Sequence, residues 1–153
     1  MNKKQSLIKR GLLNELIFIE KLKNYFNDDI EFKKTSQFFS VDFEILNDNT
    51  TIGWVELKTR RYENDINLYL AWSKLEYIYQ FGMKNTFLIW FHENKNLYYV
   101  IHLDFDTLIS IKDGTTTFLS NNQKTIDIDK KYSVCYDNIA EVAEYIKLKI
   151  YIN

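Results

Sequence analysis

The most informative segment of the sequence is residues 41–58, VDFEILNDNTTIGWVELK. Two runs rich in β-favouring residues flank a turn of short polar residues at positions 47–50. This pattern predicts a hairpin of two strands, the first over residues 38–46 and the second over residues 51–60. On the second strand Glu56 and Lys58 lie two residues apart, so they project from the same face.

These charged residues point to a particular chemistry. A glutamate and a lysine in an otherwise apolar strand are costly to bury without a partner or a role. If the hairpin places Asp42 beside Glu56, the two carboxylates repel each other unless a cation lies between them. Oxygen ligands favour Mg²⁺ or Mn²⁺, which polarise phosphoryl oxygens, while Lys58 orients or deprotonates the attacking water. The pattern therefore predicts metal-assisted hydrolysis of phosphodiester bonds.

The spacing of Asp42 from Glu56-Leu57-Lys58 resembles the PD-(D/E)XK nuclease superfamily, with Val41 at the position of the family's proline. The resemblance covers residues 6–92. It implies an α/β, restriction-endonuclease-like fold, in which a mixed β-sheet with an α-β-β-β-α-β core is flanked by helices. Within the superfamily, the first predicted helix most resembles that of small nucleases of the Holliday-junction-resolvase type. In those proteins a basic residue and a glycine precede a metal-proximal glutamate. Here Arg10-Gly11 precedes Glu15 in that way.

The resemblance also implies roles for individual residues. Asp42, Glu56 and Glu15 are the expected ligands of Mg²⁺ or Mn²⁺, and Lys58 is the expected catalytic base or charge stabiliser. Glu20 competes with Glu15 for the helix position, and the glycine spacing favours Glu15. Four basic residues are expected to contact nucleic acid: Arg10, Arg60, Arg61 and Lys74.

Periodicity predicts the remaining elements, with few boundaries marked because the chain has no proline and four glycines. A helix is expected over residues 6–26, with an apolar stripe of Leu7, Leu12, Leu16, Ile19 and Leu22. A strand at 30–34, a helix at 67–82, a doubly covered strand at 85–92 and a strand at 97–103 follow. After a looser stretch around Gly114, we expect a short strand at 126–128 and a final helix at 138–149.

Length and composition predict a single nuclease-like domain over residues 1–153, with 46% hydrophobic residues for its core. The lone cysteine, Cys135, and the absence of an apolar segment after the basic N-terminus favour a cytoplasmic protein, or a viral protein acting in a host cell. The formal net charge of −1 gives no overall support for a nucleic-acid partner, so the local basic clusters, such as Lys33-Lys34, carry that expectation.

The favoured function is a DNA endonuclease, with RNA left open as a substrate. The alternative is a catalytically silent nucleic-acid-binding or protein-interaction module on the same fold, and a third is a subunit active only within a larger complex. For Glu56 and Lys58 the competing interpretation is a cross-strand or solvent-exposed ion pair on a half-buried sheet. His92 and His102 lack metal-ligand spacing and are expected to be structural.

Many members of the family act as dimers, and four tail tyrosines are candidates for a homodimer interface: Tyr132, Tyr136, Tyr145 and Tyr151.

Overall fold

The computed structural model describes residues 2–36, 41–61, 66–120 and 122–152. Its strands are β1 (Ile30–Lys34), β2 (Phe43–Asn47), β3 (Thr50–Arg60), β4 (Leu68–Ala71), β5 (Thr86–His92), β6 (Leu97–Leu103), β7 (Thr116–Ser120), β8 (Gln123–Ile128) and β9 (Val134–Tyr136). The helices are α1 (Lys3–Lys23), α2 (Trp72–Gln80), α3 (Phe105–Gly114) and α4 (Ile139–Ile152), with a 3₁₀ turn at Lys130–Tyr132. None of the described helices is long and apolar enough to cross a membrane.

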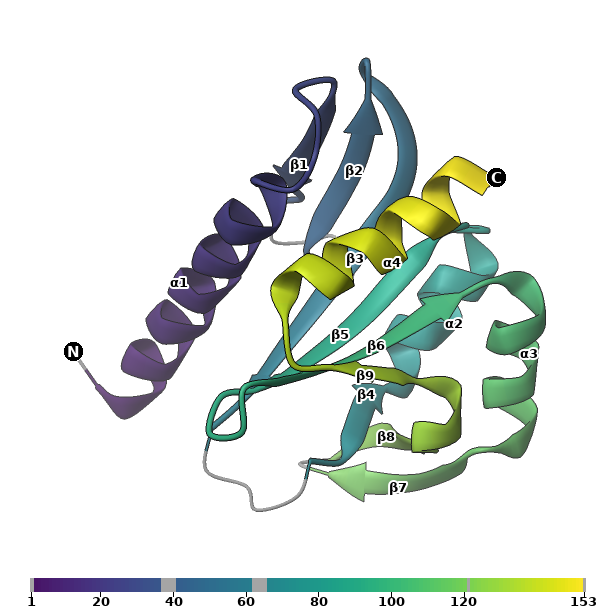
Figure 1. Ribbon diagram of the computed structural model, residues 1–153. Helices are drawn as coiled ribbons and strands as arrows, with labels where there is room; N and C mark the ends of the chain where they lie inside the picture. Colours follow the sequence, from purple (N-terminus) through teal and green to yellow (C-terminus); the bar gives the residue numbers. More distant parts are fainter. Residues whose placement is uncertain (1, 37–40, 62–65, 121, 153) are drawn as a thin grey trace.

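The strands form two sheets (Figure 1). A large sheet has the strand order β1-β2-β3-β5-β6-β9, and a small sheet has the order β4-β8-β7. Within the large sheet β3 and β5 are parallel, and the other neighbouring pairs are antiparallel. The predicted mixed sheet flanked by helices is thereby confirmed, and its α-β-β-β-α-β core runs from α1 to β5 with β4 added before α2.

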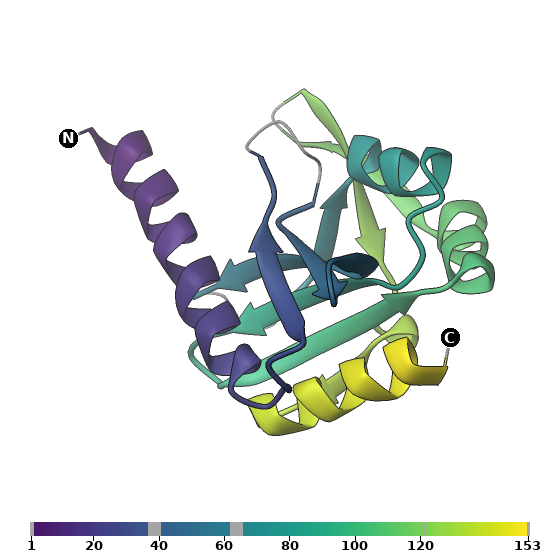
Figure 2. The ribbon, with the colours of Figure 1, turned by 90° about the horizontal axis from the view of Figure 1, so that it is seen from above.

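Hydrophobic cores lie on both faces of the large sheet (Figures 1 and 2). Helices α1 and α4 cover one face, where they pack against Val55 and Leu57 of β3. The small sheet, α2 and α3 cover the other face, where Leu88 and Trp90 of β5 are fully buried. Strand β5 is thus covered on both sides, as its unbroken apolar sequence predicts. Because side chains alternate along β3, Glu56 and Lys58 lie on the face opposite Val55 and Leu57.

Helix α1 begins and ends earlier than predicted. Asn2 caps it, because its Oδ1 accepts a hydrogen bond from the Gln5 backbone N–H at 2.9 Å and its own N–H donates to Gln5 Oε1 at 3.2 Å. In the predicted apolar stripe, Ile19 and Leu22 are buried. Leu12 and Leu16 are 47% and 55% exposed. The N-terminal part of α1 extends beyond the sheet (Figures 1 and 2).

The predicted helix at 67–82 is wrong over its first turn. Residues Leu68–Ala71 form β4, which pairs antiparallel with β8. Leu68 and Leu70 are buried while Tyr69 and Ala71 are half-buried, so the period is two rather than 3.6. Helix α2 therefore begins only at Trp72.

The predicted loose stretch around Gly114 is also wrong. Asp104 caps α3, with its Oδ1 accepting the Thr107 N–H at 2.7 Å, and β7 follows the helix. The short strand expected at 126–128 is longer and pairs with β7, and β9 was not predicted. The start of the strand predicted at 38–46 lies outside the described residues, and β2 begins at Phe43.

Three of the four tail tyrosines are half-buried in the structure. Tyr136 and Tyr145 are half-buried against the core under α4, with their ring centroids 6.0 Å apart. Tyr132 is half-buried against the core on the opposite face of the sheet. The side chain of Tyr151 lies outside the described part of the chain. These three tyrosines therefore serve packing within the chain.

Candidate active site

Glu56 is buried on the face of β3 that looks toward α2. Its side chain is 1% exposed, and its Oε2 lies 3.4 Å from Lys58 Nζ. The same oxygen is paired with Nζ of Lys74, on the first turn of α2. A solvated surface ion pair is therefore excluded for Glu56, because its carboxylate has lost nearly all contact with solvent.

Asp42 lies immediately before β2 and is fixed against β3. Its Oδ2 accepts a hydrogen bond of 2.9 Å from the backbone N–H of Leu57, the residue between Glu56 and Lys58. The backbone N–H and the hydroxyl of Thr35 both donate to the Asp42 carbonyl at 3.0 Å, which ties this position to the end of β1. The hairpin thus brings Asp42 to the same part of β3 as the predicted glutamate and lysine.

Glu15 reaches the site from α1. Its Oε2 lies 2.9 Å from Lys34 Nζ, and the same ammonium lies 3.8 Å from Asp42 Oδ1. Glu20 is exposed on the helix. Of the two helix glutamates that the sequence left open, the structure therefore places Glu15 beside Asp42.

Burial and charge shift the pKa values of two of these carboxyl groups upward. Burial raises the pKa of Glu56 to about 7, an effect that Lys58 opposes and the negative charge of Asp42 reinforces. Burial also raises the pKa of Glu15, where Lys34 opposes the shift and Asp42 adds to it. Asp42 is therefore a common neighbour of both glutamates. A carboxyl group that titrates near neutral pH in a cluster of this kind is typical of a functional site.

The residues fit a divalent cation in their chemistry. Among the described residues no three His, Cys, Asp or Glu side chains form a ready-made metal-binding group, and lysine ammonium groups lie against Glu15 and Glu56 instead. However, Glu56 Oε1 is buried and has no hydrogen-bond partner, which is unfavourable for a carboxylate oxygen. This oxygen and the Asp42 carboxylate are hard ligands of the kind that Mg²⁺ and Mn²⁺ prefer.

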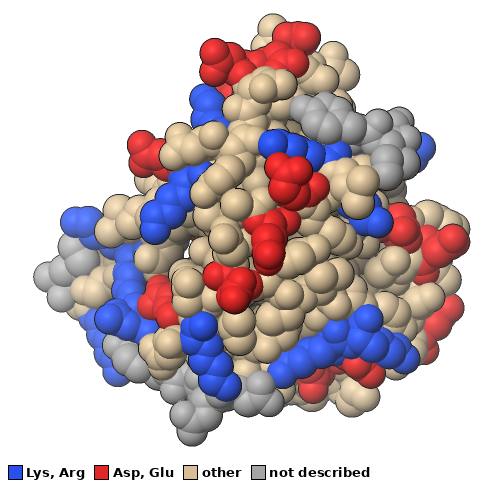
Figure 3. Space-filling model, in the orientation of Figure 1, with Lys and Arg blue, Asp and Glu red and all other residues tan. Residues whose placement is uncertain are grey.

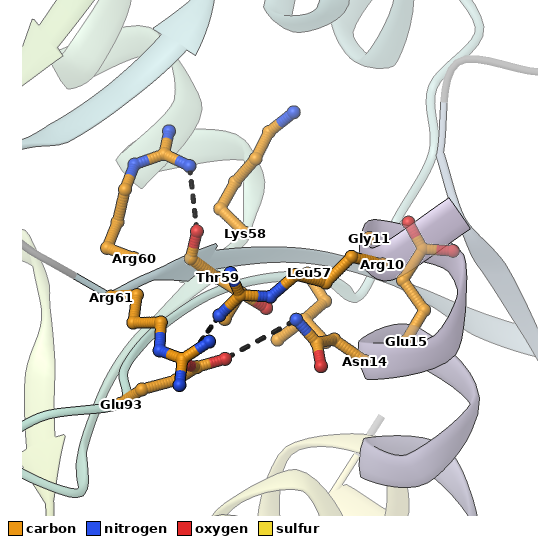
Figure 4. A pocket seen from close by; sticks show the side chains of 10 residues that line it. All are labelled: Arg10, Gly11, Asn14, Glu15, Leu57, Lys58, Thr59, Arg60, Arg61 and Glu93. Atoms are coloured by element: carbon orange, nitrogen blue, oxygen red, sulfur yellow. Dashed lines mark hydrogen bonds and ion pairs between the residues drawn. The ribbon is translucent and has the colours of Figure 1, made fainter. Parts of the chain in front are cut away.

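A pocket of about 360 Å³ lies next to this cluster, between α1 and the C-terminal end of β3 (Figure 4). Arg10, Asn14 and Arg61 converge there on the carboxylate of Glu93, at 3.3, 3.4 and 3.5 Å respectively. Arg60 also lines the pocket, and its guanidinium donates to the Thr59 carbonyl at 3.1 Å. The pocket therefore gathers three of the four basic residues expected to contact nucleic acid, while the fourth, Lys74, is at Glu56.

Two residues of this region were not predicted, Lys34 and Glu93. Lys34 stands in a visible basic pair, but its pairing with Glu15 requires knowledge of how α1 lies on the sheet. Glu93 follows β5, and the parallel register that sets Arg60 opposite His92 brings it to the end of β3. A prediction of that parallel pairing would have identified Glu93.

The two histidines are structural, as the sequence predicts. His92 is buried, and its Nδ1 accepts a hydrogen bond from the Lys95 N–H at 3.2 Å. His102 is buried, and its Nε2 lies 2.9 Å from Asn85 Oδ1. Burial lowers the pKa of His102, which favours its neutral form.

Comparison with known proteins supports the fold. No family model matches the sequence, and no curated protein matches it. Among solved structures, the chain resembles D212, a nuclease from a fusselovirus, with a TM-score of 0.55 and 12% identity over 92% of this chain and 88% of that one. It is also similar to Hjc, a Holliday junction resolvase from the archaeal hyperthermophile Archaeoglobus fulgidus, with a TM-score of 0.46 and 18% identity over 93% and 97% of the two chains. From its architecture and its likeness to D212, the chain has the restriction-endonuclease-like fold of the PD-(D/E)XK nucleases.

Proposed function

We propose that this chain is a metal-dependent nuclease that hydrolyses phosphodiester bonds, with DNA as its substrate and internal bonds as its targets. The observation that carries the proposal is the state of Glu56. It is a buried carboxylate with one oxygen against two lysines and the other without a partner, beside the fixed Asp42. Burying such a group costs stability, so its retention favours a catalytic role over a structural one.

In this proposal Asp42 and Glu56 would hold the cation, with Glu15 as an outer ligand or water positioner. A divalent ion bound there would supply polarisation of the phosphoryl oxygen and a lower pKa for water at the site. Lys58 is half-buried, and in Figure 4 its side chain extends from β3 with no hydrogen bond or ion pair drawn to the other pocket residues, so its ammonium can approach a phosphate while it remains near Glu56. Its charge stabilises the negative charge that develops on the phosphoryl oxygens, or its amine accepts the proton of the attacking water.

The basic pocket supports a polyanionic substrate. Acidic and basic side chains are mixed on the face seen in Figure 3, so that face carries no continuous basic field. The pocket beside Lys58 instead gathers Arg10, Arg60 and Arg61 in one place. A local cluster of this kind binds backbone phosphate without reading sequence. The homodimer expected from the resemblance stays a prediction, which sedimentation equilibrium tests.

Cleavage of supercoiled plasmid and of labelled DNA and RNA oligonucleotides tests the proposal. We expect cleavage with Mg²⁺ or Mn²⁺, none in EDTA, and recovery when excess Mg²⁺ is restored. Asp42→Asn keeps an oxygen that can accept the Leu57 hydrogen bond but removes the charge, so it should fold and fail to cleave. Binding of nucleic acid without cleavage by the native chain in any divalent metal would support the silent module instead.

The arginines of the pocket should control the salt dependence of binding. We expect Arg10→Gln and Arg61→Gln each to weaken DNA binding in EDTA and to reduce the slope of log K against log salt by about 1, because each removes a phosphate contact. Fluorescence anisotropy at several salt concentrations measures the slope. Lys9→Gln, an equal loss of charge at an exposed position next to Arg10, should leave the slope closer to the native value. Equal effects of Lys9→Gln and Arg10→Gln would show that the pocket itself does not bind the phosphate.

A further inference from the structure

Lys34, at the end of β1, joins two of the carboxylates expected to bind metal. Its Nζ lies 2.9 Å from Glu15 Oε2 and 3.8 Å from Asp42 Oδ1, and 5.1 Å from the centroid of the Phe43 ring. The ammonium therefore meets groups from α1, from the segment before β2 and from β2 itself. It lies where a cation would have to be to neutralise Glu15 and Asp42 together.

The carboxylate oxygens of Asp42, Glu15 and Glu56 differ in their hydrogen-bond and ion-pair partners. Asp42 Oδ2 accepts the Leu57 N–H, and Asp42 Oδ1 and Glu15 Oε2 both lie near Lys34. Glu56 Oε2 has Lys58 and Lys74, while Glu56 Oε1 is buried and has no partner. The buried oxygen without a hydrogen-bond partner is thus on Glu56, where Lys58 and Lys74 lie against the other oxygen. Glu15 and Asp42 instead share the Lys34 ammonium.

We propose that the Lys34 ammonium takes the place of a second cation between Glu15 and Asp42, so that the site binds one divalent ion, held by Asp42 and Glu56. Lysine is suited to this position because its ammonium is a compact point charge with three N–H donors. Glu15 then acts as a positioning residue that holds Lys34, and it does not bind the ion directly. This inference rests on the proposed metal dependence and specifies the number of ions and the ligands.

Titration with Mn²⁺ in the absence of nucleic acid tests this inference without measuring activity. By calorimetry and by the loss of the free Mn²⁺ electron paramagnetic resonance signal, we expect the native chain to bind one ion. Lys34→Met should bind two, because Glu15 and Asp42 are then two unneutralised carboxylates facing each other. Lys34→Gln provides a second, polar variant in case Lys34→Met does not fold, with circular dichroism as the check.

Two further variants control the experiment. Lys33→Met removes the same charge from the opposite, exposed face of β1 and should still bind one ion. Glu15→Gln should also bind one ion, because Glu15 is not a ligand in this arrangement. Two ions in the native chain, one ion in a folded Lys34 variant, two ions in Lys33→Met or loss of the ion in Glu15→Gln would each overturn the inference. A native chain that binds no Mn²⁺ and cleaves nothing would instead defeat the proposed function itself.

Discussion

Replacing Lys58 by methionine should reduce the rate of DNA cleavage by about 10²- to 10⁴-fold, the usual contribution of a group that transfers a proton or stabilises charge in the transition state. Methionine keeps most of the length of the side chain and removes only its ammonium. Because Lys58 is half-buried and Glu56 is also paired with Lys74, the fold should survive the change. Single-turnover cleavage of an oligonucleotide with saturating Mn²⁺ measures the rate.

The Mn²⁺ affinity separates a catalytic role for Lys58 from a role in metal binding. Loss of a positive charge 3.4 Å from Glu56 Oε2 should leave the affinity equal or higher, whereas loss of a ligand would lower it. Lys84→Met, at an exposed position after α2, is the matched control and should cleave at the native rate. A Lys58→Met variant that cleaves as fast as the native chain would remove Lys58 from the mechanism.

The local part of the site could be predicted from the sequence because it depends on one hairpin. A polar turn between two β-favouring runs sets the pairing of β2 with β3, and the two-residue period then puts Glu56 and Lys58 on one face. The turn residues Asp48 and Asn49 have φ values of 47° and 67°, in the left-handed region that short polar residues tolerate best. Short-range rules are sufficient for this geometry.

The parts that could not be predicted depend on contacts between distant segments. Lys34 meets Glu15 only because α1 packs on the sheet beside β1, and Glu93 meets Arg10 only across the end of the parallel β3–β5 pair. The stretch Leu68–Ala71 has helix-compatible residues but becomes a strand because β8 offers it a partner. Tertiary pairing overrides local preference in each case.

The α3 region shows a different kind of error, because its signal was present in the sequence. Asp104 precedes Leu108 and Ile111, which are three residues apart and both buried. An aspartate before apolar residues at helical spacing is a recognised start of a helix. The nearby Gly114 favours a loop by its residue type, but it is the last residue of α3.

Glu56→Gln should make the protein more stable at high pH, by about 3 kcal/mol. The sign follows from the pKa of Glu56, which rises from 4.5 to about 7 on folding. Below pH 4.5 the group is protonated in both the folded and the unfolded state, so it adds no pH-dependent cost. As the pH rises toward 7 the unfolded chain releases the proton first, and the folded state loses about 1.4 kcal/mol for each pH unit between the two pKa values.

Glutamine resembles the protonated carboxyl group and does not titrate. The variant's free energy of unfolding should therefore exceed that of the native chain only slightly near pH 4.5, and by the full amount above pH 8. Urea unfolding in EDTA at pH 5 and pH 8 measures the difference, with Glu20→Gln on the exposed side of α1 as the control. A difference that is the same at both pH values would show that burial does not disfavour the charge of Glu56.

Mn²⁺ at 100 times its dissociation constant should raise the free energy of unfolding of the native chain by about 2.7 kcal/mol and that of the variant by little, because the ion binds the folded state through this carboxylate. Together the two measurements would show that Glu56 lowers the stability of the empty site and that a bound cation restores it, which is expected of a metal ligand and not of a structural ion pair.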